Sequence, residues 1–304
     1  MQKEFEKFIK NINEKKLNVF EALVWDNGNL IEHKFNNEKK QIRKLNSISK
    51  FVTGLCVIKA TEQNLLTLDT SIMDFFKDEK IYNKENIEYL KDLKVKHLLT
   101  LTMGQEKQIS YNTTDKGISE SHSSYILNYP IKHKAGSFFF YSNADGYLLS
   151  AILQKITHKP LLQFAKDNIF SPLGITECRW DMCDKGVCLG GAGLELNIND
   201  LLKIAQLLLN NGNYEGVQII KKELIIDMKI EKVSREIVNY PYQSKVFPKY
   251  AYGYNVWLTN DGNYFADGKF GQFMFIIPKK NRIIITLSNE ENMREIVNCM
   301  EDLK

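Results

Sequence analysis

The chain has 304 residues, of which 43% are hydrophobic and 26% charged, and its formal net charge is +4 at pH 7. This is the composition of an ordinary globular protein, and the length is too short for three domains. Basic and acidic residues are interspersed without a basic stripe carrying aromatic residues, so the sequence does not indicate nucleic-acid binding.

The first residues of the chain predict an amphipathic helix. Phe5, Phe8, Ile9 and Ile12 recur at the helical spacing, and they leave no continuous apolar core of the kind found in a signal peptide. No apolar run in the chain approaches the length needed to span a membrane. With Met1 as the native start, we expect a cytoplasmic protein without membrane insertion.

A β-hairpin follows the first helix. Residues 18–25 and 30–35 read as two strands, and the Asn27-Gly28 pair between them suits the positive φ angles of a tight turn. Both strands lie far from the other strand-like segments, which are near the end of the chain.

Ser47 and Lys50 form a Ser-x-x-Lys motif at the head of an apolar run. Residues three apart share one face of a helix, so the hydroxyl and the amine would be neighbours. A lysine in an apolar pocket can be neutral near pH 7 and accept the serine proton, which makes Ser47 a candidate nucleophile and Lys50 its base. The alternative from these residues alone is a serine helix cap followed by a solvated lysine.

Residues 67–157 show helical or irregular patterns and contain a second polar group, Tyr141 and Asn143. Two positions apart in an extended segment, these side chains point to the same side. A phenol beside an ammonium can relay a proton, and the Asn amide can hold the lysine or a substrate carbonyl. The alternative is a packed tyrosine ring and an Asn helix cap. Tyr111 is a weaker candidate to line the cleft.

Strands return near the C-terminus, at residues 250–259, 262–266, 272–277 and 282–287, and an amphipathic helix covers residues 291–303. The pattern predicts an α/β (α+β) fold, in which an antiparallel sheet is built from both chain ends and flanked by the terminal helices. Residues 1–66 and 158–304 would form the α/β domain, and residues 67–157 an inserted helical domain. A cleft between the two is the expected site for a small molecule.

Five cysteines, an odd number, fit reduced thiols better than a disulfide framework. Cys178, Cys183 and Cys188 form a loose cluster without the paired spacing of a zinc site, and the five histidines show no ligand spacing. We therefore expect no metal and no cofactor.

Taken together, the motifs resemble the serine β-lactamase and penicillin-binding-protein superfamily, in its branch of class C β-lactamases, DD-peptidases and esterases. Further matching segments follow in the same order: VKHLLTLTMG at residues 95–104, the helix after Tyr141, FSPLGIT at 170–176 and GGAGL at 190–194. The resemblance implies the β-lactamase/transpeptidase-like fold, with Ser47, Lys50 and Tyr141 as catalytic residues. It also implies a structural role for His97, bonded to backbone at a helix start.

The third motif departs from the β-lactamase pattern. Where the family carries Lys-Thr-Gly or His-x-Gly, this chain has Ala266-Asp267-Gly268. The resemblance implies that the backbone N–H of Lys269, the residue after this glycine, completes an oxyanion hole with that of Ser47. The cation that helps bind a β-lactam carboxylate is missing at Ala266, which argues against efficient penicillin hydrolysis.

These observations predict a serine hydrolase that acts on an ester or small amide through an acyl-enzyme. The alternatives are a β-lactamase or D-amino-acid peptidase and a non-catalytic ligand-binding or regulatory protein with the same fold. The expected partner is a small-molecule ester, amide or β-lactam, and the sequence does not indicate an oligomeric state.

Overall fold

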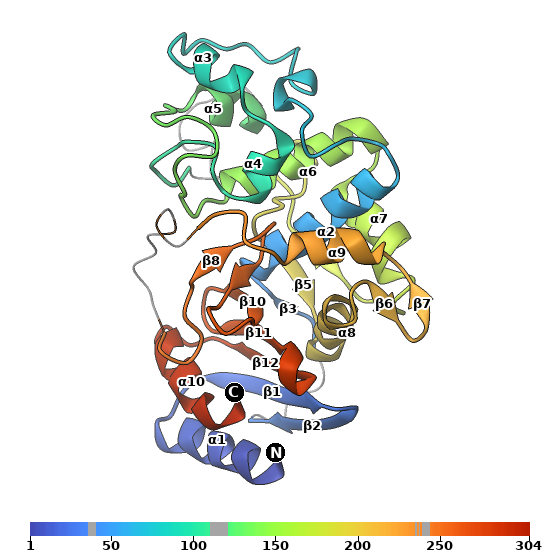
Figure 1. Ribbon diagram of the computed structural model, residues 1–304, viewed down its shortest axis with the longest axis vertical. Coiled ribbons are helices and arrows are strands. Elements are labelled where there is room, and N and C mark those ends of the chain that lie inside the picture. The colour runs from blue at the N-terminus through green and yellow to red at the C-terminus, as the bar shows by residue number, and fades with distance from the viewer. Residues whose placement is uncertain (36–40, 110–120, 235, 237, 239–243) are drawn as a thin grey trace.

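A seven-stranded antiparallel sheet forms the centre of the computed structural model, which describes all residues except 36–40, 110–120, 235, 237 and 239–243 (Figure 1). The strand order is β2-β1-β12-β11-β10-β9-β8, so both ends of the chain meet in one sheet, as the sequence predicts. The strands are β1 (Val19–Asp26), β2 (Asn29–Lys34), β8 (Ala251–Tyr252), β9 (Trp257–Leu258), β10 (Tyr264–Gly268), β11 (Gln272–Ile277) and β12 (Arg282–Ser288).

The two hairpin regions of the sheet test the strand predictions. Asn27 and Gly28 have φ angles of +50° and +91°, as the predicted tight turn between β1 and β2 requires. The prediction of one strand over residues 250–259 is wrong, because the chain reverses direction between β8 and β9. Gly253 donates its N–H to Val256 O at 2.9 Å, and Asn255 has a φ of +55°.

Helices cover both faces of the sheet (Figure 1). The terminal helices α1 (Gln2–Glu14) and α10 (Met293–Cys299) lie together on one face, and α2 (Ile48–Glu62) and α8 (Ile198–Leu209) lie on the other. β12 is buried on both sides, with Ile283 and Ile285 in the core under α2 and α8, and Ile284 in the core under the terminal helices. Burial on both faces explains its continuous apolar sequence.

The predicted helical region contributes α3 (Asn86–Lys91), α4 (Val95–Leu99), α5 (His122–Asn128) and α6 (Ala144–Thr157). Helix α6 packs against α2 and α4, and thereby brings its N-terminus to the start of α2. The division of the chain into residues 1–66 with 158–304 and residues 67–157 stays a prediction.

Shorter elements complete the described structure: η1 (Ile72–Asp74), β3 (Arg43–Lys44), β4 (Arg179–Trp180), β5 (Leu194–Leu196), α7 (Leu161–Ala165), η3 (Lys166–Phe170), β6 (Asn213–Tyr214), β7 (Val217–Gln218), α9 (Lys222–Met228), η4 (Pro278–Lys280) and η5 (Glu301–Leu303). Strands β3, β5 and β4 form a small separate sheet. The last two short helices replace parts of the predicted turn at residues 278–281 and of the predicted terminal helix.

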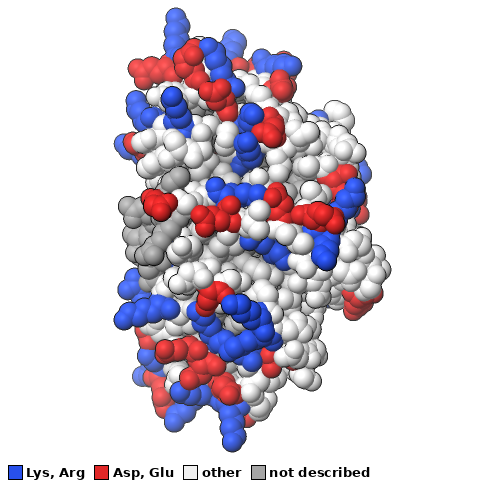
Figure 2. Space-filling view, in the orientation of Figure 1, with Lys and Arg blue, Asp and Glu red and all other residues white. Residues whose placement is uncertain are grey.

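Charges of both signs alternate over the face of the molecule seen in Figure 2. Among the described residues, no helix has the length and apolar character to cross a membrane.

Candidate active site

Ser47 is the residue immediately before helix α2, and its hydroxyl does not cap that helix. Lys50 Nζ lies 3.2 Å from Ser47 Oγ, and the Lys50 residue is only 1% exposed. The alternative of a capping serine followed by a solvated lysine is therefore wrong.

The ammonium of Lys50 is enclosed by acceptors from three segments. Besides Ser47 Oγ, it donates to Asn143 Oδ1 and, at 2.9 Å, to Gly191 O. Gly146 permits this arrangement, because a Cβ there would lie 2.6 Å from Gly191 N. Burial removes water from Lys50 and lowers its pKa to about 7, so a neutral amine is accessible at neutral pH.

Tyr141 lies beside Lys50 and lines the same cavity as Ser47. Lys50 Nζ is 4.7 Å from the centroid of the Tyr141 ring, which stacks on Trp257 with centroids 5.5 Å apart. Asn143 occupies the N-cap position of α6 but makes no side-chain capping bond, since its carboxamide oxygen faces Lys50. Instead, Ser142 Oγ accepts the N–H of Ala144 at 3.0 Å. The structure thus brings both Tyr141 and Asn143 to Lys50.

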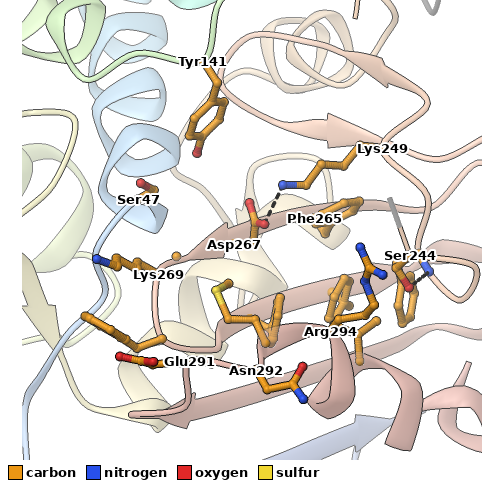
Figure 3. Close-up of a pocket in the computed structure, with 17 residues that line it drawn as sticks. Ser47, Tyr141, Ser244, Lys249, Phe265, Asp267, Lys269, Glu291, Asn292 and Arg294 are labelled. Atoms are coloured by element: carbon orange, nitrogen blue, oxygen red, sulfur yellow. Dashed lines mark hydrogen bonds and ion pairs between the residues drawn. The ribbon is translucent and has the colours of Figure 1, made fainter. Parts of the chain in front are cut away.

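The end of strand β10 lies directly beside Ser47. A Cβ built on Gly268 would be 2.2 Å from Leu45 O and 3.1 Å from Ser47 N, so only glycine allows this approach. Asn46 Nδ2 donates to Lys269 O at 2.7 Å and fixes the following peptide. The Lys269 side chain extends away from Asp267, and its ammonium lies over the Phe270 ring at 4.7 Å (Figure 3).

A cavity of about 670 Å³ opens at Ser47 and Tyr141 and runs over strands β10 and β11 to helix α10 (Figure 3). Its wall is more apolar than polar, with polar and charged groups both near Ser47 and toward α10, which is compatible with a small-molecule site. The lining residues are Ser47, Tyr141, Ser244, Phe247, Lys249, Phe265, Asp267, Gly268, Lys269, Phe270, Phe273, Phe275, Glu291, Asn292, Met293, Arg294 and Val297.

Sequence reasoning missed an ion pair in this cavity. Lys249 Nζ and Asp267 Oδ2 are 2.7 Å apart, and both side chains are largely buried. The motif comparison located no cation at Ala266, but the fold supplies one from the segment before β8. Lys249 is 17 residues upstream of Ala266 and belongs to no motif, so only the hairpin geometry of β8 to β10 reveals it.

Asp145 is the second charged group that sequence reasoning missed. It lies in the first turn of α6, fully buried, and burial raises the pKa of its carboxyl to about 8. When it is ionised, its negative charge raises the pKa of Lys50. Its position two residues after Asn143 of the Tyr-x-Asn motif was the available signal.

Two other sequence-derived candidates have different outcomes. His97 Nδ1 accepts the N–H of Lys94 at 3.0 Å at the start of α4, which confirms its structural interpretation. Burial lowers the pKa of this imidazole to about 4, so the ring is neutral at physiological pH. Tyr111 lies outside the described residues.

The cysteines are free thiols. Burial raises the pKa of the Cys178 and Cys188 thiols, which disfavours the thiolate form that binds metals. Over the part of the chain that the structure describes, no group of three or more His, Cys, Asp and Glu side chains is placed to hold a metal ion.

The fold and this serine–lysine site define a class of serine hydrolases, and a family comparison agrees. The model of the Beta-lactamase family matches residues 5–298, so the chain belongs to the β-lactamase family of serine hydrolases.

Individual relatives are distant. A putative D-alanyl-D-alanine carboxypeptidase of Escherichia coli (strain K12) is 24% identical over 144 residues, a match that spans 33% of this chain and 33% of that protein. The chain therefore spans about a third of the length of this curated relative.

Two solved structures share the fold over nearly the whole chain. EstCE1, described as a hydrolase with promiscuous acyltransferase activity, superposes with a TM-score of 0.79 and 16% identity, and covers 99% of both chains. A putative 6-aminohexanoate-dimer hydrolase from Bacillus anthracis gives a TM-score of 0.78 and 21% identity, covering 97% of this chain and 80% of its own.

Proposed function

We propose that this protein hydrolyses uncharged esters or small amides through an acyl-enzyme formed on Ser47. The observation that carries the proposal is the 3.2 Å contact between Lys50 Nζ and Ser47 Oγ, made by a buried lysine whose pKa is lowered to about 7. A neutral amine at hydrogen-bond distance is the group that a serine hydroxyl requires to become a nucleophile.

The reaction has two halves. Ser47 Oγ attacks the carbonyl carbon while its proton passes to the neutral amine of Lys50, aided by the neighbouring Tyr141. The bond to the alcohol or amine leaving group then breaks, and the same proton protonates that group. A water molecule attacks the acyl-enzyme, gives a proton to Lys50, and releases the acid as Ser47 Oγ recovers its hydrogen. No cofactor takes part in this scheme.

The backbone N–H groups of Ser47 and Lys269 are the proposed oxyanion hole. The end of β10 lies against Ser47, and, among the residues that the structure describes, neither the Ser47 nor the Lys269 N–H donates to another group. Two such donors aimed at one point stabilise the negative charge that develops on the carbonyl oxygen. Asn143 is assigned to hold Lys50 and to orient the substrate.

An uncharged ester or amide is favoured over an anionic substrate because Asp267, which lines the cavity near Ser47, occupies the Lys249 cation in an ion pair. The structural relatives are described as a hydrolase with acyltransferase activity and a dimer hydrolase, which is compatible with ester or amide chemistry.

A second candidate function is hydrolysis of a β-lactam or a D-amino-acid peptide. Its support is the cation of Lys249 in the cavity, together with the name of the carboxypeptidase relative. A non-catalytic binding role is disfavoured, because a buried lysine beside the serine is costly and serves no purpose in a simple pocket.

Covalent labelling with a fluorophosphonate tests the proposal. Wild-type protein should incorporate the probe and hydrolyse 4-nitrophenyl acetate, and Ser47→Ala should do neither while remaining folded. Ser244→Ala is the matched control, because Ser244 lines the same cavity but accepts the N–H of Val246 and has no contact with Lys50. This control should keep the label, and a label retained in Ser47→Ala would refute the mechanism.

A further inference from the structure

The ion pair between Lys249 and Asp267 faces the cavity that contains Ser47 (Figure 3). Asp267 directly precedes Gly268, whose backbone abuts the nucleophile, so the pair lies within reach of a substrate bound at Ser47. The side chains of Lys249 and Asp267 are only 9% and 14% exposed. The pair is therefore a fixed part of the site wall.

Aromatic rings and a second hydrogen bond hold both charged groups. Asp267 Oδ2 binds Lys249 Nζ at 2.7 Å, and Asp267 Oδ1 accepts the indole N–H of Trp257 at 3.0 Å. Lys249 Nζ lies 4.4 Å from the Trp257 ring centroid and 5.8 Å from that of Tyr141. Because Trp257 also stacks on Tyr141, the pair is tied to the catalytic tyrosine.

We propose that Asp267 is a specificity-determining residue, which neutralises the Lys249 cation and so makes the site selective for substrates without a carboxylate near the reacting carbonyl. The inference rests on the proposed function and adds a substrate class to it. It also implies that the site contains a latent anion subsite, which becomes available once the charge of Asp267 is removed.

Electrostatics explains the selectivity. An incoming carboxylate would have to displace Asp267 from Lys249 or remain beside a second carboxylate, and neither arrangement compensates the loss of its water. Three other charged groups line the wall: Lys269 turns away from Asp267, Arg294 lies at the end far from Ser47, and the carboxylate of Glu291 would not attract an anion (Figure 3). An uncharged substrate does not meet this obstacle.

The first test uses matched substrates that differ in one carboxylate. Phenyl acetate is compared with 4-acetoxybenzoate, and 4-nitrophenyl hexanoate with the 4-nitrophenyl monoester of adipic acid, so that the charge lies on the leaving group or on the acyl chain. Wild-type protein should prefer the neutral member of each pair. Asp267→Asn should raise the relative kcat/KM of the anionic member about tenfold in at least one pair, the worth of one charge-assisted hydrogen bond.

The double variant Lys249→Met with Asp267→Asn is the control. It removes both charges, so it should return the ratio to nearly the wild-type value, and the single variant Asp267→Ser should behave like Asp267→Asn. An unchanged ratio in folded Asp267→Asn, or the same rise in the double variant, would overturn the proposal. So would a wild-type protein that uses the anionic members as well as the neutral ones.

A binding measurement separates this inference from the proposed function. Phenylboronic acid and 3-carboxyphenylboronic acid add to nucleophilic serines, and their dissociation constants are measurable by calorimetry without turnover. Asp267→Asn should tighten the carboxylated boronate about tenfold relative to the parent. If this occurs while no ester is hydrolysed, the ester hypothesis fails and the role of Asp267 stands. If esters are turned over and the boronate affinities do not shift, the role of Asp267 fails and the ester hypothesis stands.

Discussion

Lys50 Nζ lies 3.2 Å from Ser47 Oγ, one helical turn away at the start of α2. The lysine is almost completely buried, and its pKa of about 7 places the neutral and charged forms in balance near neutral pH. The helical spacing thus places the amine beside the hydroxyl, and burial gives that amine the pKa that the proposed reaction requires.

Replacing Lys50 should abolish most of the activity. Lys50→Met removes the proposed acceptor of the serine proton, and general acid–base catalysis typically contributes roughly 10² to 10⁴ in rate. Lys269→Met is the matched control, because only the backbone N–H of Lys269 has a proposed role and its side chain points away from the site. Steady-state kcat with 4-nitrophenyl acetate measures both effects, and equal losses would mean that the catalytic lysine is misassigned.

The pH dependence of kcat/KM should show one inflection at about 7, set by Lys50. Only the neutral amine accepts a proton, so activity should fall about tenfold per pH unit below the inflection. Burial is the largest cause of this low pKa; the charge of Lys249 lowers it further, while Asp267, and Asp145 in its ionised form, oppose the shift. A profile that stays flat from pH 8 to pH 5 would exclude Lys50 as the base.

Burial of Lys50 should also appear in the stability of the protein. Its pKa is about 7 when folded and 10.5 as the reference value, so the unfolded chain binds more protons between these pH values. The free energy of unfolding therefore rises with pH through this window, by about 2 kcal/mol between pH 7 and pH 9.

Lys50→Met should lack this component. Urea unfolding of both proteins at pH 7 and pH 9 measures this component. The change in unfolding free energy with pH is compared between the two proteins, so the effects of groups that do not interact with Lys50 cancel. Equal pH dependence of the two proteins would show that the lysine is hydrated and has an ordinary pKa.

Gly268→Ala tests the approach of β10 to the nucleophile. An added methyl group would meet Leu45 O at 2.2 Å, so the strand end must move away from Ser47 and take the Lys269 N–H with it. A displacement of about 1 Å in a catalytic group can cost 10²-fold in rate. Gly262→Ala is the control, because its φ of +86° makes it strained while the space around it is open. It should lower stability slightly and leave kcat unchanged.

Much of the fold followed from local patterns in the sequence. The apolar strands β11 and β12, the Asn27-Gly28 turn and the helix after Ser47 depend on neighbouring residues, and each was predictable to within a few positions. The short β8–β9 hairpin was not, because its reversal depends on Gly253, where a Cβ would lie 2.4 Å from the distant Met228 O.

The candidate site likewise contains residues that local motifs predicted and residues that only the tertiary structure reveals. Ser47, Lys50, Tyr141 and Asn143 lie in short motifs that resemble a known family, and the structure brings all four together. Lys249 could not be recognised, because its importance comes from burial beside Asp267 and Trp257, which lie further along the chain, whereas Asp145 offered only its position near the Tyr-x-Asn motif. A charged residue in an ordinary sequence context gives no sign of the environment that tertiary packing will create.

The preference between an ester and a β-lactam is the strictest test of the site. 4-Nitrophenyl acetate should exceed nitrocefin by at least about tenfold in kcat/KM, or ~1.4 kcal/mol of transition-state preference. The motif at Ala266 indicates one reason for this, a missing cation. The structure points to a different reason. The cavity does contain a cation, Lys249, but this cation is paired with Asp267.

Two variants distinguish these reasons. Asp267→Asn should improve nitrocefin hydrolysis and leave the ester almost unchanged, because it exposes the Lys249 ammonium to the β-lactam carboxylate. Ala266→Lys should not help, since Ala266 is 4% exposed and lies in the core, where a lysine would be buried without a partner. A wild-type protein that already prefers nitrocefin would show that Lys249 exchanges Asp267 for the substrate at little cost, and the site would then be that of a β-lactamase.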